Sequence, residues 1–397
     1  MDDENQKLSD NNFRTPEQIA SIEDRVPEKR NPLKRSILNH PKLSWINRLT
    51  KKQKIIIVVV AVLVIAGLAF GIYKLVHHKA PTLVKHAVVI VKAKPKSLTV
   101  ASNLTGLQVL PAVNSRPVTG VMIENSDAAR PQSGLSEAGV VFEAVAEGGV
   151  TRFLALYQDN QPSSIGPIRS LRPYYLSWDM GFDAPIAHVG GSPDALADVQ
   201  SWGAENLDEF YNGSYYTRIT SREAPHNVYT SIAELNALET SKGYTSSVYT
   251  SFPRKADSPS ASPTATTIGL VLSGSDYNAS YSYDKTTNSY NRSEGGATQT
   301  DLLTGTQISP KVVIAIVVPE SQGALDASGA YYSDYSFIGS GQVDVFQDGI
   351  VTVGTWQKTS NTSQITFTNS NGSPIKLNAG QTWITAVSES SAISYSK

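Results

Sequence analysis

The chain has 397 residues, a formal net charge of −1 at pH 7 and no cysteine. The absence of cysteine excludes disulfides, thiolate metal ligands and a cysteine nucleophile. The nearly balanced charge argues against a protein that binds nucleic acid in bulk.

The chain opens with a polar tail, residues 1–54. Its first 40 residues are rich in Asp, Glu, Asn, Lys and Arg and hold too few apolar side chains to form a core. Such a composition predicts a disordered segment.

The next segment is the longest apolar run of the chain, Ile55–Tyr73. A run of about 20 apolar residues matches the hydrocarbon thickness of a bilayer, and it lies too deep in the chain for a cleavable signal. We expect one transmembrane helix at 55–76 and a basic stalk at 77–104. Lys51, Lys52 and Lys54 crowd the entry to the helix, which places the N-terminus in the cytoplasm.

A first folded unit, residues 105–250, mixes strand and helix patterns. PVTGVMIE (117–124) reads as a buried strand, and VVFEAVAE (140–147) and VTRFLALYQ (150–158) read as a hairpin around Gly148-Gly149. The turn would place Val145 opposite Arg152 and Glu143 opposite Leu154, with Arg152 between Glu143 and Glu147 on one face.

A strand at 183–189 and a helix after it complete the pattern of the first unit. Ser192 fits the N-cap position, Pro193 the first helical position and Asp194 the acidic first turn. Strand, Gly-Gly and helix start in sequence form an α/β connection, so an α/β or mixed α+β fold is expected here.

A Pro/Ser/Thr-rich linker at 251–267 separates this unit from a second unit, residues 268–397. The second unit alternates polar and apolar residues almost throughout, and Asp348-Gly349 and Asn371-Gly372 are hairpin turn signals. A mostly-β domain, a small sandwich or barrel, is expected to fold separately from the first unit.

Long motifs in both units closely resemble the YerB-like family of bacterial envelope proteins. They are VMIENSDAARPQSGLSEAGVVFEAVAEGGVTRFLALYQ, IGPIRSLRPYY, HVGGSPDAL and APHNVYTS in the first unit, and FQDGIVTVGTWQK and AGQTWI in the second. The resemblance implies an extracytoplasmic protein with an N-terminal and a C-terminal domain. Family members often carry a lipid-modified N-terminal cysteine, whereas this chain has the apolar segment instead.

A fainter likeness connects the chain with LytR–CpsA–Psr proteins, single-span transferases that move glycan from polyprenyl pyrophosphate to the cell wall. The shared order is Arg130, Ser136-Glu137, Arg169 to Pro173 and Gly190 to Ser192. The key aspartates of those proteins are absent or replaced here, so the likeness is an analogy.

Three arginines and a helix start are the predicted ligand-binding residues. Arg169 and Arg172 are three residues apart, so one helical turn would place both on one face, and Arg130 lies in a loop after a strand. Arginine suits bidentate binding of phosphate or carboxylate, and amides at a helix start can cradle an anion. The predicted anion site is Arg130, Arg169, Arg172, Gly190, Gly191 and Ser192; the alternative is that the arginines form structural ion pairs with Glu124, Glu143, Glu147 or Asp179.

Four further residues are considered for catalysis: Glu143, Glu147, His188 and His226. Glu143 and Glu147 would lie about 13 Å apart on one strand face, beyond the carboxyl separation of glycosidases. His188 at a strand end and His226 in a loop could each act as a base or be a hydrogen-bonded structural residue. No HxH or HExxH spacing is present, so neither a metal nor a cofactor is expected.

The leading hypothesis is an envelope module that binds a ligand or regulates a partner through an anion site in the first unit. An enzyme of polyprenyl-pyrophosphate or cell-wall glycan transfer and a protein–protein scaffold are the alternatives. The expected partners are the membrane and a cell-wall glycan, a polyprenyl phosphate or a cell-wall protein, but not nucleic acid.

The lysines before the apolar run generate a topology prediction. Protease added to intact protoplasts should remove everything after about residue 80 and spare the N-terminal tail, because short basic flanks stay in the cytoplasm. An epitope at each end of the chain reports the two fragments, and a protected C-terminal epitope would show the opposite orientation.

Overall fold

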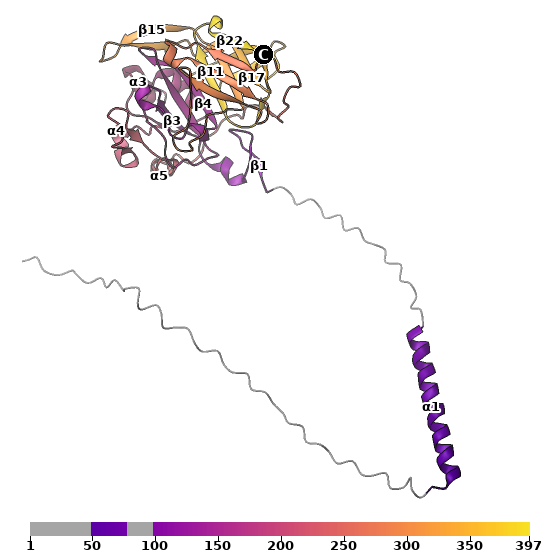
Figure 1. The fold of residues 1–397 in the computed structure, drawn as a ribbon. Coiled ribbons are helices and arrows are strands. Elements are labelled where there is room, and N and C mark those ends of the chain that lie inside the picture. Colours follow the sequence, from indigo (N-terminus) through magenta and orange to yellow (C-terminus); the bar gives the residue numbers. More distant parts are fainter. Residues whose placement is uncertain (1–48, 78–97) are drawn as a thin grey trace, which may run out of the picture. The chain divides into compact units, whose positions relative to one another are not determined.

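The structure, a computed structural model, describes residues 49–77 and 98–397. Helix α1 (Lys51–His77) has 27 residues, none of them buried, and is long and apolar enough to cross a membrane (Figure 1). At 1.5 Å per residue it is about 40 Å long. The predicted disordered tail and most of the predicted stalk lie outside the described residues.

The described residues from 98 onward belong to one globular unit built around a large sheet (Figure 1). The strands follow one another across the sheet in the order β19 (Thr366–Asn369), β18 (Ile350–Lys358), β17 (Gly339–Gln347), β14 (Val312–Val317), β21 (Thr382–Val387), β4 (Val140–Glu147), β5 (Val150–Tyr157), β3 (Thr119–Glu124) and β6 (Ile186–Ala187). A hairpin, β15 (Glu320–Leu325) and β16 (Tyr331–Tyr335), joins it where Tyr332 pairs with Glu147.

A second sheet consists of β13 (Ala297–Thr298), β12 (Ser289–Glu294), β11 (Ala279–Asp284), β10 (Thr267–Leu270) and β22 (Ile393–Ser396), in that order. The helices of the globular unit are α2 (Pro173–Met180), α3 (Pro193–Ser201), α4 (Glu209–Asn212) and α5 (Ile232–Lys242). Three short strand pairs complete it: β1 (Val100–Ala101) with β2 (Gln108–Val109), β7 (Thr217–Arg218) with β8 (Val228–Tyr229), and β9 (Arg254–Lys255) with β20 (Leu377–Asn378).

Many of the predicted elements are confirmed. The strand at 117–124, the Gly148-Gly149 hairpin and the helix that Ser192 caps are all present, with the Ser192 hydroxyl accepting from Ala195 N at 3.3 Å. Asp348 and Gly349 have φ angles of 58° and 75°, as the hairpin between β17 and β18 requires. The strand expected at 183–189 is reduced to the two residues of β6.

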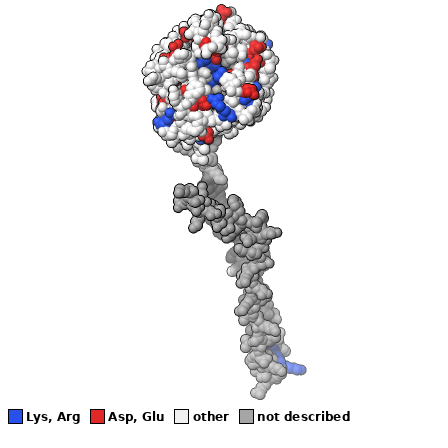
Figure 2. All heavy atoms as spheres, turned by 90° about the vertical axis from the view of Figure 1, so that its left-hand side faces the viewer, with Lys and Arg blue, Asp and Glu red and all other residues white. Residues whose placement is uncertain are grey.

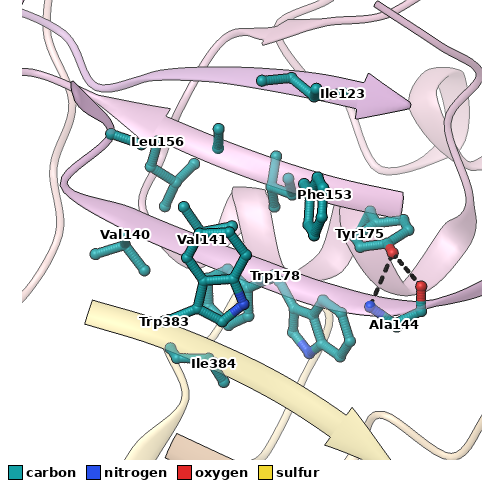
Figure 3. Packing of buried hydrophobic residues seen from close by; sticks show 14 of the residues in the cluster. Ile123, Val140, Val141, Ala144, Phe153, Leu156, Tyr175, Trp178, Trp383 and Ile384 are labelled. Carbon is teal, nitrogen blue, oxygen red and sulfur yellow. Dashed lines mark hydrogen bonds between the residues drawn. The ribbon is translucent and has the colours of Figure 1, made fainter. Parts of the chain in front are cut away.

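The two sequence-defined units meet inside the large sheet rather than across a linker. Strand β21 of the second unit pairs in parallel with β4 of the first and with β14, and Figure 3 shows Trp383 and Ile384 beside Val140 and Val141. These strands are buried on both faces, which explains the continuous apolar run of β14. The second unit is mostly strand, as expected, but its strands extend the sheet of the first unit.

The two faces of the large sheet carry different layers. Phe142 and Ala144 lie against α2. The Phe142 ring stacks on Trp178, with 5.2 Å between the ring centroids. The Tyr175 hydroxyl accepts from Ala144 N and donates to Ala144 O (Figure 3). Glu143 points to the other face, where it meets Arg292 of β12. The helices and the second sheet therefore cover opposite faces.

A β-bulge in β4 overturns the predicted register of the hairpin. Glu147 lies opposite Val150, but Arg152 lies opposite Ala144 rather than Val145, and Glu143 opposite Phe153 rather than Leu154, because the register shifts between Val145 and Glu147. One extra residue reverses the alternation of the strand. Glu143 and Glu147 therefore lie on opposite faces and do not form a pair.

The predicted linker also takes part in the fold. Its strand β9 pairs with β20, and Lys255 donates to Asp348 and to Asn378. One hydrophobic core runs through residues of both units. Separate folding of the two units stays a prediction, and the shared sheet and core argue against it.

A buried ion pair ties three strands together at the junction. The Glu143 carboxylate accepts from Arg292 at 2.6 Å, from the Trp383 indole at 2.8 Å and from the Thr385 hydroxyl at 3.2 Å. The Arg292 guanidinium lies 4.6 Å from the Trp383 ring centroid, and both charged side chains are fully buried. Strands β4, β12 and β21 thus share one electrostatic contact.

Glu143→Gln should destabilise the globular unit strongly, because it leaves the buried Arg292 charge without a full counter-charge. Breaking a buried pair typically costs about 3–5 kcal/mol. Urea unfolding measures the change, and Glu389→Gln, at an exposed position, should alter the free energy of unfolding by less than about 0.5 kcal/mol. Equal effects of the two substitutions would contradict the role of the pair.

Candidate functional site

A partly exposed group of polar side chains lies where β3 ends; we call it the Glu124 site. Glu124 is the last residue of β3, and Ser126 follows two residues later. An extended segment runs beside this strand end and brings in Arg169, whose amide donates to Met122 O at 3.0 Å. The β7–β8 region supplies His226 and Tyr229. A hydrogen bond from Ile168 N to Val228 O, at 2.7 Å, holds this region against the segment that carries Arg169.

One oxygen of the Glu124 carboxylate organises the site. Glu124 is 3% exposed, and its Oε1 accepts from His226 Nδ1 and from Ser126 Oγ, both at 2.9 Å. Arg169 Nε lies 3.5 Å from the same oxygen. The carboxylate can only accept, so it fixes the His226 tautomer with the proton on Nδ1 and leaves Nε2 as the basic nitrogen.

Ser126 is not placed as a nucleophile. Its hydroxyl donates to Glu124 and lies 3.3 Å from His226 Nδ1, the nitrogen that the carboxylate also contacts. A Ser–His–acid triad needs the hydroxyl on one ring nitrogen and the carboxylate on the other. The site therefore holds a His–carboxylate dyad with a serine that steadies the carboxylate.

Several polar atoms of the site have no partner among the described residues. Glu124 Oε2 and the Tyr229 hydroxyl are buried without a hydrogen bond, and neither terminal nitrogen of Arg169 makes one. Burial raises the pKa of Tyr229, with nearby Arg222 acting in the opposite direction and Glu124 adding to the rise. Buried polar groups normally have partners, so exceptions that converge mark a place for water or a ligand.

The site also opens to solvent. The side chains of Arg169 and His226 are 27% and 24% exposed. A guanidinium with two unused terminal nitrogens can bind a carboxylate or phosphate in bidentate fashion, and His226 Nε2 can accept or return a proton. The arrangement thus offers anion binding beside an oriented base.

Arg172, predicted to act with Arg169, lies in a different environment. The segment before α2 is extended, with Arg172 as the β-region residue that precedes the helix, so the expected shared helical face is wrong. Arg172 is 4% exposed, donates to Glu147 and to Leu171 O, and stacks 4.7 Å from the Tyr332 ring centroid.

The Glu147 carboxylate pairs with the guanidinium groups of Arg152 and Arg172. It accepts from Arg172 and, at 2.5 Å, from Arg152, whose other nitrogen donates to Ser170 O at 2.9 Å. Burial acts to raise the pKa of Glu147, but the two guanidinium groups outweigh it and lower the pKa. This geometry matches the structural ion pair that was the alternative for Arg172, and it leaves Glu147 no role as an acid.

Arg130 is also occupied by protein groups. It donates to the side chain of Asn125 at 3.2 Å, to Asn125 O at 3.1 Å and to Asp276 O at 2.9 Å, and pairs with Asp127 at 3.2 Å. It therefore does not join Arg169 in one anion site.

The predicted Gly-Gly-Ser cradle has little capacity left. Gly190 N donates to Asp208 at 2.9 Å and Ser192 N to Leu171 O at 3.2 Å. Gly191 pairs with Leu171 in a single parallel bridge, whose two hydrogen bonds run from Leu171 N to Gly190 O and from Ser192 N to Leu171 O rather than from the Gly191 amide. Two of the three amides therefore serve the adjoining loops, which leaves at most the Gly191 amide for an anion.

His188 is a structural residue in this fold. It is fully buried, and its two ring nitrogens contact Gly190 O at 2.8 Å and Asn206 Oδ1 at 3.0 Å. Burial lowers its pKa, against the opposing effect of Asp208. The two histidines therefore separate, His188 into the core and His226 into the open site.

Ser126 and Tyr229 were missed by sequence reasoning. Their only signal is spacing, two residues after Glu124 and three after His226. Nothing in the sequence shows that these short motifs meet, because the contact depends on the extended segment between them. In the part of the chain that the structure describes, no cluster of three or more His, Asp or Glu residues is arranged to hold a metal ion.

Substitution of Arg169 and of Arg172 should show which of the two arginines stabilises the fold. Arg172→Ala should lower the free energy of unfolding by about 3 kcal/mol, because it removes a buried partner of Glu147. Arg169→Ala should lower it by less than about 1 kcal/mol, because Arg169 makes one long, partly exposed contact. Chemical denaturation measures both, and a larger effect at Arg169 would refute the assignment.

Comparisons with known proteins agree with the architecture. The model described as "Protein of unknown function (DUF3048) N-terminal domain" matches residues 104–245, and its C-terminal counterpart matches 268–384. The "Putative lipoprotein YerB" of Bacillus subtilis (strain 168) is 33% identical over 299 residues, which are 74% of this chain and 88% of that protein.

A solved structure resembles the globular unit. The crystal structure of YerB protein from Bacillus subtilis matches with a TM-score of 0.67 and 30% identity, and the match covers 75% of this chain and all of that one. With both family models matched in order and most of the relative's length covered, the chain belongs to the YerB family, built from the N- and C-terminal DUF3048 domains.

Proposed function

We propose that the protein is a membrane-anchored, extracytoplasmic binding module whose Glu124 site holds an anionic group of an envelope component. Helix α1 supplies the anchor, and the lysines before it favour a cytoplasmic N-terminus. The relative named as a lipoprotein would be held at a membrane by different means. A common location outside the cytoplasm is consistent with both kinds of anchor.

One observation carries the proposal: the two terminal nitrogens of Arg169 are unused beside His226. The other predicted arginines donate to Glu147 or to Asn125 and Asp276, so their charge is compensated by the fold. Arg169 instead keeps a planar pair of donors at a partly exposed position. Planar paired donors suit the oxygens of a phosphate or carboxylate.

The wider surface is compatible with this role. Figure 2 shows the side of the globular unit on which α3, α4 and β15 lie in Figure 1; basic and acidic side chains gather near its middle on a largely uncharged surface. Local rather than overall charge would then attract the ligand. Wall glycans that carry phosphate or carboxylate and polyprenyl phosphates have the required chemistry.

Catalysis at the same site is the second candidate function, and the His226–Glu124 dyad is the observation that favours it. A carboxylate that orients imidazole through Nδ1 leaves Nε2 to take a proton from a hydroxyl of a bound substrate. Together with an anion held by Arg169, this would suit transfer to or from a phosphorylated glycan.

Titration of the full-length protein in nanodiscs with inorganic phosphate, pyrophosphate and acetate tests the proposal. Arg169→Ala should weaken binding about tenfold or more, because a charge-assisted hydrogen bond contributes roughly 1.5–3 kcal/mol. Arg169→Lys should restore only part of the affinity, because lysine lacks the planar fork.

The matched control is Arg218→Ala, which removes an exposed arginine paired with Glu209. It should leave the affinity unchanged. Undiminished binding by Arg169→Ala, with the control equally unaffected, would remove the Glu124 site from the proposal. His226→Gln then separates the two functions, since it should abolish transfer while retaining most anion affinity.

A further inference from the structure

A cavity with several polar side chains in its wall lies between the two sequence-defined units. It encloses about 220 Å³ between the loop at 130–132 and the hairpin of β12 and β13. Its lining residues are Arg130, Pro131, Gln132, Glu294, Ala297, Thr298, Gln299 and Thr300. We call it the Glu294 cavity.

This cavity is separate from the Glu124 site although neighbouring residues link them. Glu124 and Asn125 are consecutive, yet Glu124 contacts His226 while Asn125 donates to Glu294 at 2.6 Å. Their side chains leave the end of β3 in different directions. A ligand in one site therefore need not touch the other.

A buried carboxyl with one unused oxygen forms part of the cavity wall. Glu294 is 4% exposed, and its Oε1 accepts from Asn125. Its Oε2 is buried and has no hydrogen-bond partner. Burial raises the pKa of Glu294 to about 7, so near neutral pH this group can donate as well as accept.

Amide and hydroxyl groups stand beside this carboxyl. The Gln299 carbonyl accepts from Arg292 at 2.8 Å, which fixes the orientation of the side chain, while its amide nitrogen has only a long contact of 3.4 Å to Gln132. The hydroxyls of Thr298 and Thr300 make no hydrogen bond within the described residues. The cavity thus offers a pre-oriented amide donor and two hydroxyls in addition to the carboxyl.

The charges of the wall disfavour a charged ligand. Arg130 and Arg292 each lie 3.6 Å from Glu294 Oε1, so a cation would compete with two guanidinium groups. The donors of Arg130 are used by Asn125, Asp127 and Asp276, so the wall offers no free cationic donor to balance the charge of an anion. A neutral ligand with adjoining donors and acceptors fits best.

We propose that the Glu294 cavity binds vicinal hydroxyl groups of a neutral saccharide unit. A sugar hydroxyl can donate to Glu294 Oε2 while its neighbour accepts from Gln299 and the threonine hydroxyls. Pockets for drug-sized ligands enclose about 300–1,000 Å³, so the smaller cavity suits a single ring. This binding is independent of the anion proposed for the Glu124 site.

Saturation-transfer NMR with the full-length protein in nanodiscs tests the proposal, with glucose, N-acetylglucosamine and inorganic phosphate as probes. The sugars should receive saturation from the wild-type protein. Glu294→Gln, which keeps the shape and removes the carboxyl, should weaken sugar binding at least tenfold. A double variant, Thr298→Val with Thr300→Val, should do the same with little risk to the buried network, because it changes the rim alone.

Two controls fix the interpretation. Thr359→Val removes an exposed hydroxyl elsewhere and should change nothing, and Arg169→Ala should retain sugar binding even if it loses phosphate binding. The proposal is overturned if neither sugar receives saturation, if the threonine double variant binds as wild type, or if phosphate rather than sugar binding depends on Glu294.

Discussion

The fold depends on the buried contact of Glu143 with Arg292, which joins the first sequence-defined unit to the second. A buried charge pair is tolerated only where further hydrogen bonds satisfy it, and the Trp383 indole and Thr385 hydroxyl do so here. Since those two residues lie on β21, the pair also fixes β21 against β4. The same constraint places β12, and with it Glu294, near the end of β3.

Local elements of this fold could be read from the sequence, whereas their assembly could not. Gly148-Gly149, Asp348-Gly349 and the Ser192 cap are short-range signals whose physics lies within a few residues. The bulge between Val145 and Glu147 has no comparable signal in the sequence. It alone places Glu143 on the opposite face of the sheet from Glu147 and Arg152. Joining of the two units rests on pairing between strands more than 200 residues apart, which no local pattern encodes.

The candidate site likewise has residue types that the sequence suggests and an arrangement that it does not. Arginine chemistry directed attention to this region, but the sequence cannot distinguish a guanidinium that the fold already pairs from one whose donors remain unused. Arg172 and Arg169 differ by three positions, yet one stacks on Tyr332 and bonds Glu147 while the other keeps its terminal nitrogens open. The difference arises because the segment is extended and its neighbours come from the distant β16 and β8 regions.

The position of β21 has a consequence for how the molecule is made. This strand lies in the middle of the large sheet, between β14 and β4, but follows all the other strands of that sheet in sequence. During synthesis this edge of β4 lacks its partner strand until β21 has emerged. The large sheet therefore cannot be completed progressively from the N-terminal side, and the incomplete chain exposes an unpaired strand edge that favours aggregation.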